Sequence, residues 1–245
     1  MQDDRGKGFS ADFGRTAEDY AAHRAGFPGS FYARLALHGI GLPEQSVLDL
    51  GTGTGVVARA LAGHGCHVVG LDIAAAPIAA ARAESTGLAE AAFDVVIAGQ
   101  CWHWFERRKV ADECRRLLRP GGRLVIAHYD WIALPGNVVE ATEALIVRYN
   151  PAWTFSGGDG FYPRWLRGLA RGGYTGLETF SDDVDQPYSH EAWRGRVRAS
   201  AGIGASLSLE QVARFDAEHA AMLRQRFPED PLSALHRVFA VIARR

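Results

Sequence analysis

Val47-Leu48-Asp49-Leu50-Gly51-Thr52-Gly53-Thr54-Gly55 is a short apolar run followed by glycine at every second position. The next segment, residues 56–62, is rich in alanine and places its apolar residues at helical spacing. The two segments therefore predict a strand, a tight turn and a helix, in that order. Glycine in the turn would let the backbone pass very close to a bound ligand.

A carboxylate lies on either side of this turn. Asp49 precedes the first glycine by two positions, and a second apolar run, residues 67–71, ends in Asp72. In α/β nucleotide folds, a carboxylate at the tip of the second strand binds the ribose hydroxyls. The dinucleotide fingerprint would need a glycine where this chain has Val56. The pattern is therefore acid-x-Gly-x-Gly-x-Gly, and it predicts no pyrophosphate site.

This pattern resembles motif I of the class I S-adenosylmethionine-dependent methyltransferases, in particular the small-molecule, type 11 kind. The resemblance covers residues 9–130 and continues only in outline beyond them. It implies an α/β fold with a Rossmann-like, doubly wound, mostly parallel sheet, an antiparallel terminal strand and a helical cap insertion. It also implies S-adenosyl-L-methionine as cofactor and S-adenosyl-L-homocysteine as product.

The resemblance further implies a set of cofactor contacts around the turn and at the ends of the following strands. Tyr20 and Arg24 are four residues apart on one predicted helix face, where they either reach the cofactor or substrate or form a surface packing pair. The expected cofactor-binding residues are Asp49, Gly51, Thr52, Gly53, Gly55, Asp72, Ile73, Ala83, Glu84, Gln100, Tyr20 and Arg24.

The segment between Asp72 and Phe93 is about 15 residues shorter than the resemblance implies. Relatives of this fold complete a helix and add a further strand before a loop like residues 83–88, which contacts the adenine through its backbone. Either the natural chain is trimmed here, or the 245 residues omit a segment. Loss of a central strand would leave unpaired hydrogen-bonding groups in the sheet, which favours the omission.

An aromatic segment, residues 99–105, follows directly on the predicted buried strand 93–98. Ligands of open α/β sheets bind at this carboxyl end of the strands. The segment contains Trp102-His103-Trp104, a form that recurs beside the transferable methyl group in methyltransferases of this type. The tryptophans could instead pack under the helix that follows. His103 is either a site residue, a satisfied structural histidine or a metal ligand.

Three side chains are candidates for catalysis: His103, His128 and Tyr129. The last two follow the predicted strand 123–127, so they lie at a carboxyl edge or cap the strand end. Displacement at a sulfonium methyl group rests mainly on in-line positioning and exclusion of water, and it needs a base only where the acceptor must lose a proton. His103 is the first candidate for that base, followed by His128 and Tyr129.

The chain is expected to form a single methyltransferase domain, 1–245. Its parts are N-terminal helices (9–40), a cofactor-binding core (41–131), a substrate cap (132–230) with one core strand near 177–180, and a terminal core strand (237–243). The aromatic residues of the cap either line an apolar pocket for the acceptor or form the cap's own core. The expected substrate-pocket residues are Trp102, Trp104, Trp131, Trp153, Phe161 and Tyr162.

The composition is that of an ordinary globular protein, with 47% hydrophobic residues, 22% charged residues and a net charge of -1. No basic footprint suggests nucleic acid, and no apolar run suggests a signal peptide or a membrane span. Cys66, Cys101 and Cys114 lack metal-ligand spacing and are expected to be buried or half-buried free thiols, so no metal site is predicted. We expect a cytoplasmic monomer or homodimer with a small-molecule substrate, no nucleic acid and no membrane partner.

Two other functions stay open on the sequence alone. An NAD-dependent oxidoreductase would need a complete glycine fingerprint and a second catalytic set, and neither is visible. A non-catalytic S-adenosylmethionine-binding module is harder to separate, because the acids and glycines of the turn report on binding alone. The expected reaction is direct methyl transfer to an O, N or C atom of a small molecule, with possible deprotonation by a histidine.

Overall fold

The computed structural model describes residues 23, 25–72 and 82–245. The expectations about Tyr20, Arg24 and Ile73 fall outside these residues. The chain forms two compact units. The core unit comprises Gly26–Tyr129, Phe161–Asp182 and Val238–Arg245, and the helical unit comprises Asp130–Gly160 and Asp183–Arg237 with His23 and Ala25. That the whole of 1–245 is one domain stays a prediction.

Six strands form one sheet in the order β2-β1-β3-β4-β6-β5. The strands are β1 (Ser46–Leu50), β2 (His67–Leu71), β3 (Phe93–Gly99), β4 (Leu118–Trp131), β5 (Thr175–Tyr188) and β6 (Leu232–Arg244). β1 pairs in parallel with both β2 and β3, and β3 pairs in parallel with β4. The parallel part of the sheet is therefore built from segments in which the sequence predicted strands.

The terminal strand β6 runs antiparallel to β4. In the helical unit, the Ile132 N–H at the end of β4 donates to the Leu235 carbonyl near the start of β6, at 2.9 Å. In the core unit, the Arg245 N–H after β6 donates to the Gly122 carbonyl near the start of β4, at 3.0 Å. The predicted antiparallel terminal strand is thus confirmed, and it extends further than residues 237–243.

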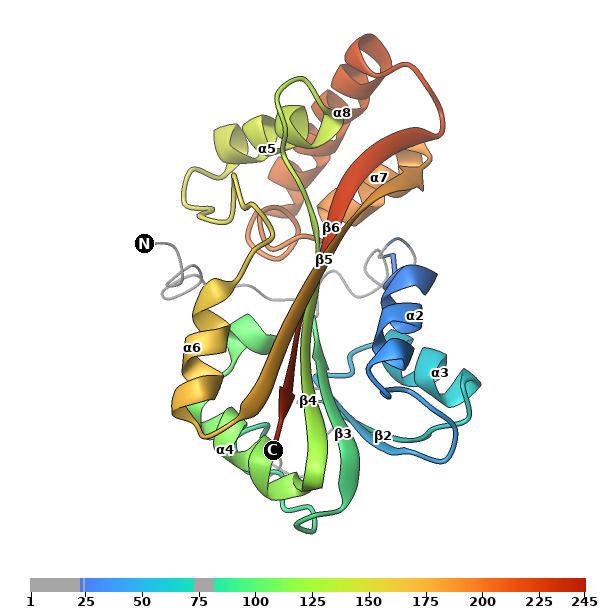
Figure 1. Cartoon of the computed structure of the whole chain (residues 1–245). Helices are drawn as coiled ribbons and strands as arrows, with labels where there is room; N and C mark the ends of the chain where they lie inside the picture. Colours follow the sequence, from blue (N-terminus) through green and yellow to red (C-terminus); the bar gives the residue numbers. More distant parts are fainter. Residues whose placement is uncertain (1–22, 24, 73–81) are drawn as a thin grey trace. The chain divides into compact units, whose positions relative to one another are not determined.

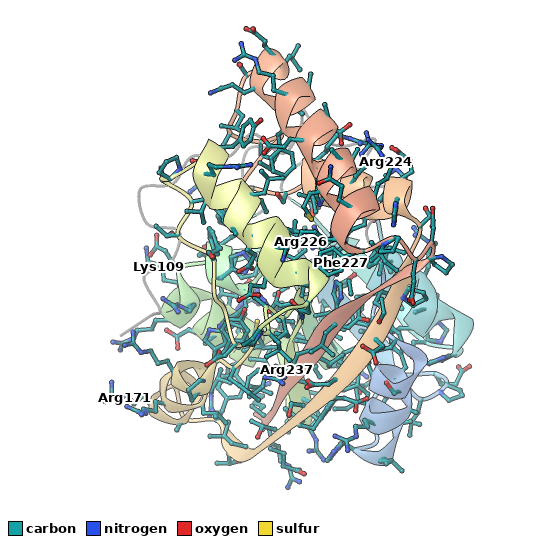
Figure 2. All side chains as sticks on the ribbon, turned by 90° about the horizontal axis from the view of Figure 1, so that it is seen from above. Lys109, Arg171, Arg224, Arg226, Phe227 and Arg237 are labelled. Atoms are coloured by element: carbon teal, nitrogen blue, oxygen red, sulfur yellow. The ribbon has the colours of Figure 1, made fainter. Side chains whose placement is uncertain are left out.

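The polar run of residues 181–185 belongs to β5, whereas the sequence predicted a strand only near 177–180. Arg237 on β6, labelled in Figure 2, donates from Nε and Nη2 to the two carboxylate oxygens of Asp183, both at 2.6 Å. The Ser233 hydroxyl donates to Asp185 at 3.2 Å. These bonds between neighbouring strands hold in extended pairing a sequence whose composition disfavours it.

Helices cover both faces of the sheet in the core unit. They are α2 (Gly29–Leu37), α3 (Val56–Gly63), α4 (Arg107–Leu117) and α6 (Pro163–Arg171). Figure 1 shows α2 and α3 on one face and α4 and α6 on the other. Leu48 and Leu50 of β1 form one buried cluster with Val110 of α4 and Trp165 of α6. The doubly wound arrangement expected from the sequence is confirmed.

The helical unit contains α5 (Val138–Tyr149), α7 (His190–Arg198) and α8 (Leu209–Arg226). Each helix begins at a side-chain cap that satisfies free N–H groups of its first turn. The Asn137 and Ser189 side chains cap α5 and α7, and Ser208 forms a full capping box with Gln211 at α8. Among the described residues, no helix is long and apolar enough to cross a membrane.

β2 is the edge strand of the described sheet, and Val69 within it is 45% exposed. β1 pairs with β2 on one side and with β3 on the other, so no place in the described middle of the sheet is unfilled. The expectation that the short segment after Asp72 removes a central strand was wrong. A strand added beyond β2 would extend the edge, and its absence breaks no existing pairing. The hydrogen-bonding argument for an omitted segment therefore no longer holds.

The three cysteines are buried free thiols, as the sequence predicted. Cys66 and Cys101 each donate from Sγ to a backbone carbonyl, at 3.2 and 3.1 Å. Cys114 on α4 is fully buried, and this burial raises the pKa of its thiol. The cysteines therefore serve packing in this structure.

Candidate cofactor and catalytic site

The glycine turn is held directly against the end of β2. The Gly51 and Thr52 N–H groups both donate to the Leu71 carbonyl, at 2.8 and 3.1 Å. The Gly53 N–H donates to Asp72 Oδ2 at 2.7 Å. The structure thus brings together the turn and the acid at the tip of the second strand, which the sequence predicted to face the same ligand.

The three glycines of the turn have left-handed backbone angles, with φ of 66° at Gly51, 51° at Gly53 and 74° at Gly55. A Cβ at Gly51 would lie 2.8 Å from the Sγ atom of Cys101. At Gly53, no heavy atom of the described structure lies within 4 Å of the corresponding position. Packing therefore requires Gly51, whereas Gly53 faces open space where the backbone can approach a ligand.

Asp49 is a buried carboxylate beneath the turn, with only 2% of its surface exposed. The Thr52 hydroxyl donates to its Oδ2 atom at 2.8 Å. Burial raises the pKa of Asp49 to about 6, although hydrogen bonds from Thr52 and Ala58 oppose the shift, and the charge of Asp72 adds to it. A nearby cation would favour the ionised form, so this position suits a cationic ligand.

Gln100 follows β3 at its carboxyl end and has a φ of 65°, which is unusual for a residue other than glycine. Its N–H donates to the Ala127 carbonyl at 2.8 Å, and its side-chain amide donates to the Tyr129 carbonyl. The Tyr129 side chain is itself buried, with 3% exposed. Strained backbone that is fixed by its neighbours is typical of ligand sites.

His103 and His128 lie in contact. His103 comes just after strand β3, and His128 lies on the neighbouring strand β4. His103 belongs to the short helix η2 (Trp102–Trp104), and its Nδ1 atom lies 3.3 Å from Nε2 of His128 on β4. His128 is buried and His103 is half-buried. One nitrogen of the pair must carry the hydrogen that the other accepts, so the tautomers of the two rings are coupled.

The two tryptophans beside His103 have different environments. Trp102 is 2% exposed and belongs to the buried cluster that contains Val110 of α4. Trp104 is 44% exposed. Trp102 thus has the packing position that the sequence left open as an alternative, and Trp104 is the one available at the surface.

A set of aromatic rings surrounds His128 in the core unit. Tyr162 stacks on Trp165, with ring centroids 4.1 Å apart, and both rings lie within 5 Å of the His128 ring. Phe161 is 43% exposed and contacts Phe239 edge to face. Of the expected substrate-pocket residues, Phe161 and Tyr162 therefore lie in the same unit as the two histidines.

Trp131 and Trp153 belong to the helical unit, where Trp153 is part of the buried cluster and the partly buried Trp131 packs against it. Trp153 is 6% exposed. The Trp131 Nε1–H donates to the buried Glu143 carboxylate at 2.9 Å, and its ring meets Trp193 edge to face. These side chains have structural contacts of the kind expected if the aromatic residues form the cap's own core.

Ala83 and Glu84 form a tight turn between Arg82 and Ser85, whose backbones are bonded to each other. The Glu84 carboxylate accepts from the Glu106 N–H at 3.1 Å, at the amino end of α4. The predicted adenine contacts are thus placed beside the helix that follows η2.

Sequence reasoning did not single out Tyr32 on α2. Its hydroxyl is buried and has no hydrogen-bond partner among the described residues. Burial, and then the charge of Asp49, raise the pKa of Tyr32 to about 12. No spacing in the sequence signals this proximity, because only the packing of α2 against the sheet creates it.

Comparison with known proteins agrees with this geometry. Residues 48–126 match the family described as Methyltransferase domain. The match contains the glycine turn, Asp72 and His103. These residues carry the methyltransferase domain, and the resemblance to the class I S-adenosylmethionine-dependent methyltransferases holds over them. Among the expected cofactor contacts, only Tyr20 and Arg24 lie outside the segment that matches the methyltransferase family.

Similar sequences are methyltransferases of several kinds. An uncharacterized methyltransferase of Mycobacterium tuberculosis is 33% identical over 127 residues, which are 47% of this chain and 51% of that protein. A ubiquinone biosynthesis O-methyltransferase of Xylella fastidiosa is 28% identical over 66% of this chain and 71% of its own. A malonyl-[acyl-carrier protein] O-methyltransferase of Enterobacter lignolyticus is 33% identical over 51% and 55%. The chain thus spans about half the length of the mycobacterial relative.

Solved structures support the methyltransferase fold. A methyltransferase from Anaeromyxobacter dehalogenans has a TM-score of 0.60 and 23% identity, over 90% of this chain and 97% of its own. A phosphoethanolamine N-methyltransferase of Haemonchus contortus, solved with S-adenosyl-L-methionine, has a TM-score of 0.53 and 18% identity, over 99% of this chain and 58% of its own.

The site residues of this methyltransferase domain fit the cofactor of the family. Gly53 leaves space for a ligand against the backbone, and Asp72 sits at the end of β2 with a carboxylate that already accepts a hydrogen bond. The raised pKa of Asp49 suits a cation nearby. Asp72 can therefore accept hydrogen bonds from ribose hydroxyls, and the carboxylate of Asp49 can attract a positively charged sulfonium amino acid.

Proposed function

We propose that this protein catalyses S-adenosylmethionine-dependent methyl transfer to a small-molecule acceptor. The observation that carries the proposal is the bond between the Gly53 N–H and Asp72, because it joins the glycine turn to the acid that binds ribose in folds of this kind. An open space at Gly53 and a buried acid at Asp49 complete the arrangement.

The residues of the turn would hold the cofactor by its methionine and ribose parts. Asp72 would exchange its bond to Gly53 for the ribose hydroxyls, and the backbone of Gly53 would approach the cofactor most closely. Asp49 would stay ionised beside the bound cation. S-adenosyl-L-methionine supplies an activated methyl group when bound, so these residues need only orient it and exclude water.

His103 would serve as the base for an acceptor that must lose a proton. If His103 donates its Nδ1–H to Nε2 of His128, its own Nε2 atom presents a lone pair and can take the proton. The buried His128 would then fix the tautomer and the ring orientation of His103. Tyr129 is the weaker candidate, because its side chain is buried.

An oxygen atom is the acceptor that we favour over nitrogen or carbon. Two of the relatives described above are O-methyltransferases by name. A hydroxyl or carboxyl acceptor loses a proton in methylation, which matches the use of a histidine base. Trp104, Phe161 and Tyr162 would provide the apolar contacts to such an acceptor.

Two measurements test the proposal against its rivals. Calorimetric titration should show binding of S-adenosyl-L-homocysteine and none of NAD; the reverse result would support an oxidoreductase. Incubation of the protein with methyl-labelled S-adenosyl-L-methionine and a pool of small metabolites should then yield labelled product. Binding without transfer to any acceptor class would favour a non-catalytic binding module.

A further inference from the structure

The loop of residues 82–88, called here the adenine loop, is attached to a helix and not to the sheet. Its bridge is internal, between Arg82 and Ser85, and among the described residues it pairs with no strand of the sheet. In the sequence, this loop begins ten residues after Asp72, at the end of the edge strand β2. Its position must therefore be fixed by other contacts.

Glu113 on α4 provides the central contact. Its Oε1 atom accepts from the Thr86 N–H at 2.9 Å and from the Thr86 hydroxyl at 2.6 Å. Thr86 is 7% exposed, and the Glu113 side chain is 10% exposed. A carboxylate that is buried to this degree requires a cation or several donors, and here it has both.

Arg116 completes the contact from one turn further along α4. Its Nε atom donates to Glu113 Oε2 at 2.8 Å, and its Nη2 atom donates to Oε1 at 2.7 Å. The same Nη2 atom donates to the Leu88 carbonyl at 2.8 Å, and the Leu88 N–H donates to the Thr86 hydroxyl at 3.2 Å. The four residues form one closed network around the end of the adenine loop.

The charge of Glu113 is secure at any ordinary pH. The hydrogen bond from Arg116 is the main factor that lowers the pKa of Glu113 to about 2, and the bonds from Thr86 add to it. Glu113 therefore does not change its protonation state near neutral pH, and the network does not depend on pH there. It is therefore a permanent part of the folded protein.

The start of the adenine loop is also fixed to α4. Glu84 accepts from the N–H of Glu106, the residue that precedes the first turn of α4. Glu106 comes two residues after η2, which carries His103. One helix thus holds both ends of the adenine loop and directly follows the segment of the candidate base.

We propose that Glu113 and Arg116 are positioning residues for the cofactor, which hold the adenine loop in its binding conformation without touching the ligand. The inference rests on the proposed function and deepens it. A loop that is ordered before binding loses little conformational entropy when the adenine arrives, whereas a free loop must be ordered at the expense of affinity. In the part of the chain that the structure describes, α4 and not a strand supplies the contacts of this loop.

The experiment compares ligand affinity in the full chain and in variants of the network. Glu113→Ala removes the carboxylate at the centre of the network. Thr86→Val removes only the hydroxyl and keeps a side chain of similar volume. S-adenosyl-L-homocysteine and adenosine are titrated by calorimetry at a temperature where thermal unfolding shows each variant to be folded. Glu210→Gln is the matched control, since it removes a carboxylate from an exposed helical ion pair with Arg214 on α8.

We expect Glu113→Ala to lower the affinity for both ligands about tenfold and Thr86→Val to lower it by a smaller factor. Glu210→Gln should leave the affinity unchanged. The double variant should be weaker than wild type by less than the product of the two factors, since both changes break one network. In turnover, the KM for S-adenosyl-L-methionine should rise while kcat and the KM for the acceptor stay close to wild type. Arg116→Lys keeps the charge and loses the paired hydrogen bonds of the guanidinium, so its affinity should lie between those of wild type and Glu113→Ala.

A purely structural role predicts a different result: a lower melting temperature with unchanged affinity in the folded variants. Affinities of Glu113→Ala and Thr86→Val within twofold of wild type would overturn the inference, as would an equal loss in Glu210→Gln. If Glu113→Ala does not fold, Thr86→Val decides alone. Failure of the wild-type chain to bind S-adenosyl-L-homocysteine would refute the proposed function itself, which separates the two outcomes.

Discussion

The glycine turn and the histidine pair are two parts of the candidate site that are built by different means. The turn is one continuous stretch whose backbone conformation follows from its glycines, and it meets Asp72 at the end of the adjacent strand. The histidine pair joins residues 25 positions apart through a side-chain contact of 3.3 Å. A binding element made of backbone can be predicted from the local sequence, whereas one made of side chains from distant segments depends on tertiary packing.

The surroundings of the two parts differ in the same way. Around the turn, the key polar contacts come from backbone N–H groups that any residue could supply. Around the histidine pair, the support comes from particular side chains: Trp104 contacts His103, and Tyr162 contacts His128. Substitutions on the histidine side should therefore affect folding or chemistry strongly, whereas in the turn a substitution at Gly53 should act mainly on ligand affinity and one at Gly51 on packing.

The largest expected effect concerns the two tryptophans beside His103. Trp102→Ala should lower the free energy of unfolding by about 3–5 kcal/mol, because it empties a buried site. Trp104→Ala should change it by less than about 1 kcal/mol, because that ring is exposed. Denaturant unfolding of both variants checks this. Equal losses would show that the exposed and buried rings do not differ as the structure indicates.

His103→Gln should reduce kcat by about 100-fold or more, because general base catalysis contributes that much where a proton must be removed. The affinity for S-adenosyl-L-homocysteine should not change, since the histidine would act on the acceptor. His128→Gln should give a smaller reduction, because it acts by orienting His103. Steady-state turnover with calorimetric binding checks both variants, and wild-type turnover in His103→Gln would remove the base from the mechanism.

Substitutions in the turn should separate packing from binding. Gly53→Ala should cost roughly 1 kcal/mol of stability for its left-handed φ and weaken S-adenosyl-L-homocysteine about tenfold by filling the open space. Gly51→Ala should cost more stability, about 2 kcal/mol, because its Cβ meets Cys101. Unfolding and binding measured on the same samples check the pair. A Gly53→Ala variant with full affinity would contradict a close approach of the ligand at this residue.

The smallest expected effect is a pH dependence at Asp49. The pKa of this acid is raised to about 6 in the folded protein, so the folded state holds the proton more tightly than the unfolded state. Wild-type stability should therefore fall as the pH rises, by about 1 kcal/mol between pH 5 and pH 8 from this group. Asp49→Asn should lack this part of the dependence and should bind S-adenosyl-L-methionine less well at pH 8. Thermal unfolding across the pH range, with Asp112→Asn on α4 as an exposed control, measures the difference.

Much of the core unit could be predicted from the sequence. The apolar runs that form β1, β2 and β3 and the amphipathic spacing of α4 were read correctly because parallel strands and their covering helices have strong local patterns. The length of β5 could not be read, because its polar half is held by Arg237 on another strand. The expectation of a lost central strand was wrong, since sheet order is not a local property of the sequence.

The sequence by itself determined the glycine turn, the acids at the two strand ends and the family, because backbone geometry and spacing are local. Only the tertiary structure decided which tryptophan is buried, that His128 contacts His103, and that Glu113 and Arg116 hold the adenine loop. Each of these depends on side chains from distant segments that meet by packing. Among the described residues, the contacts of the loop of residues 82–88 come from helix α4.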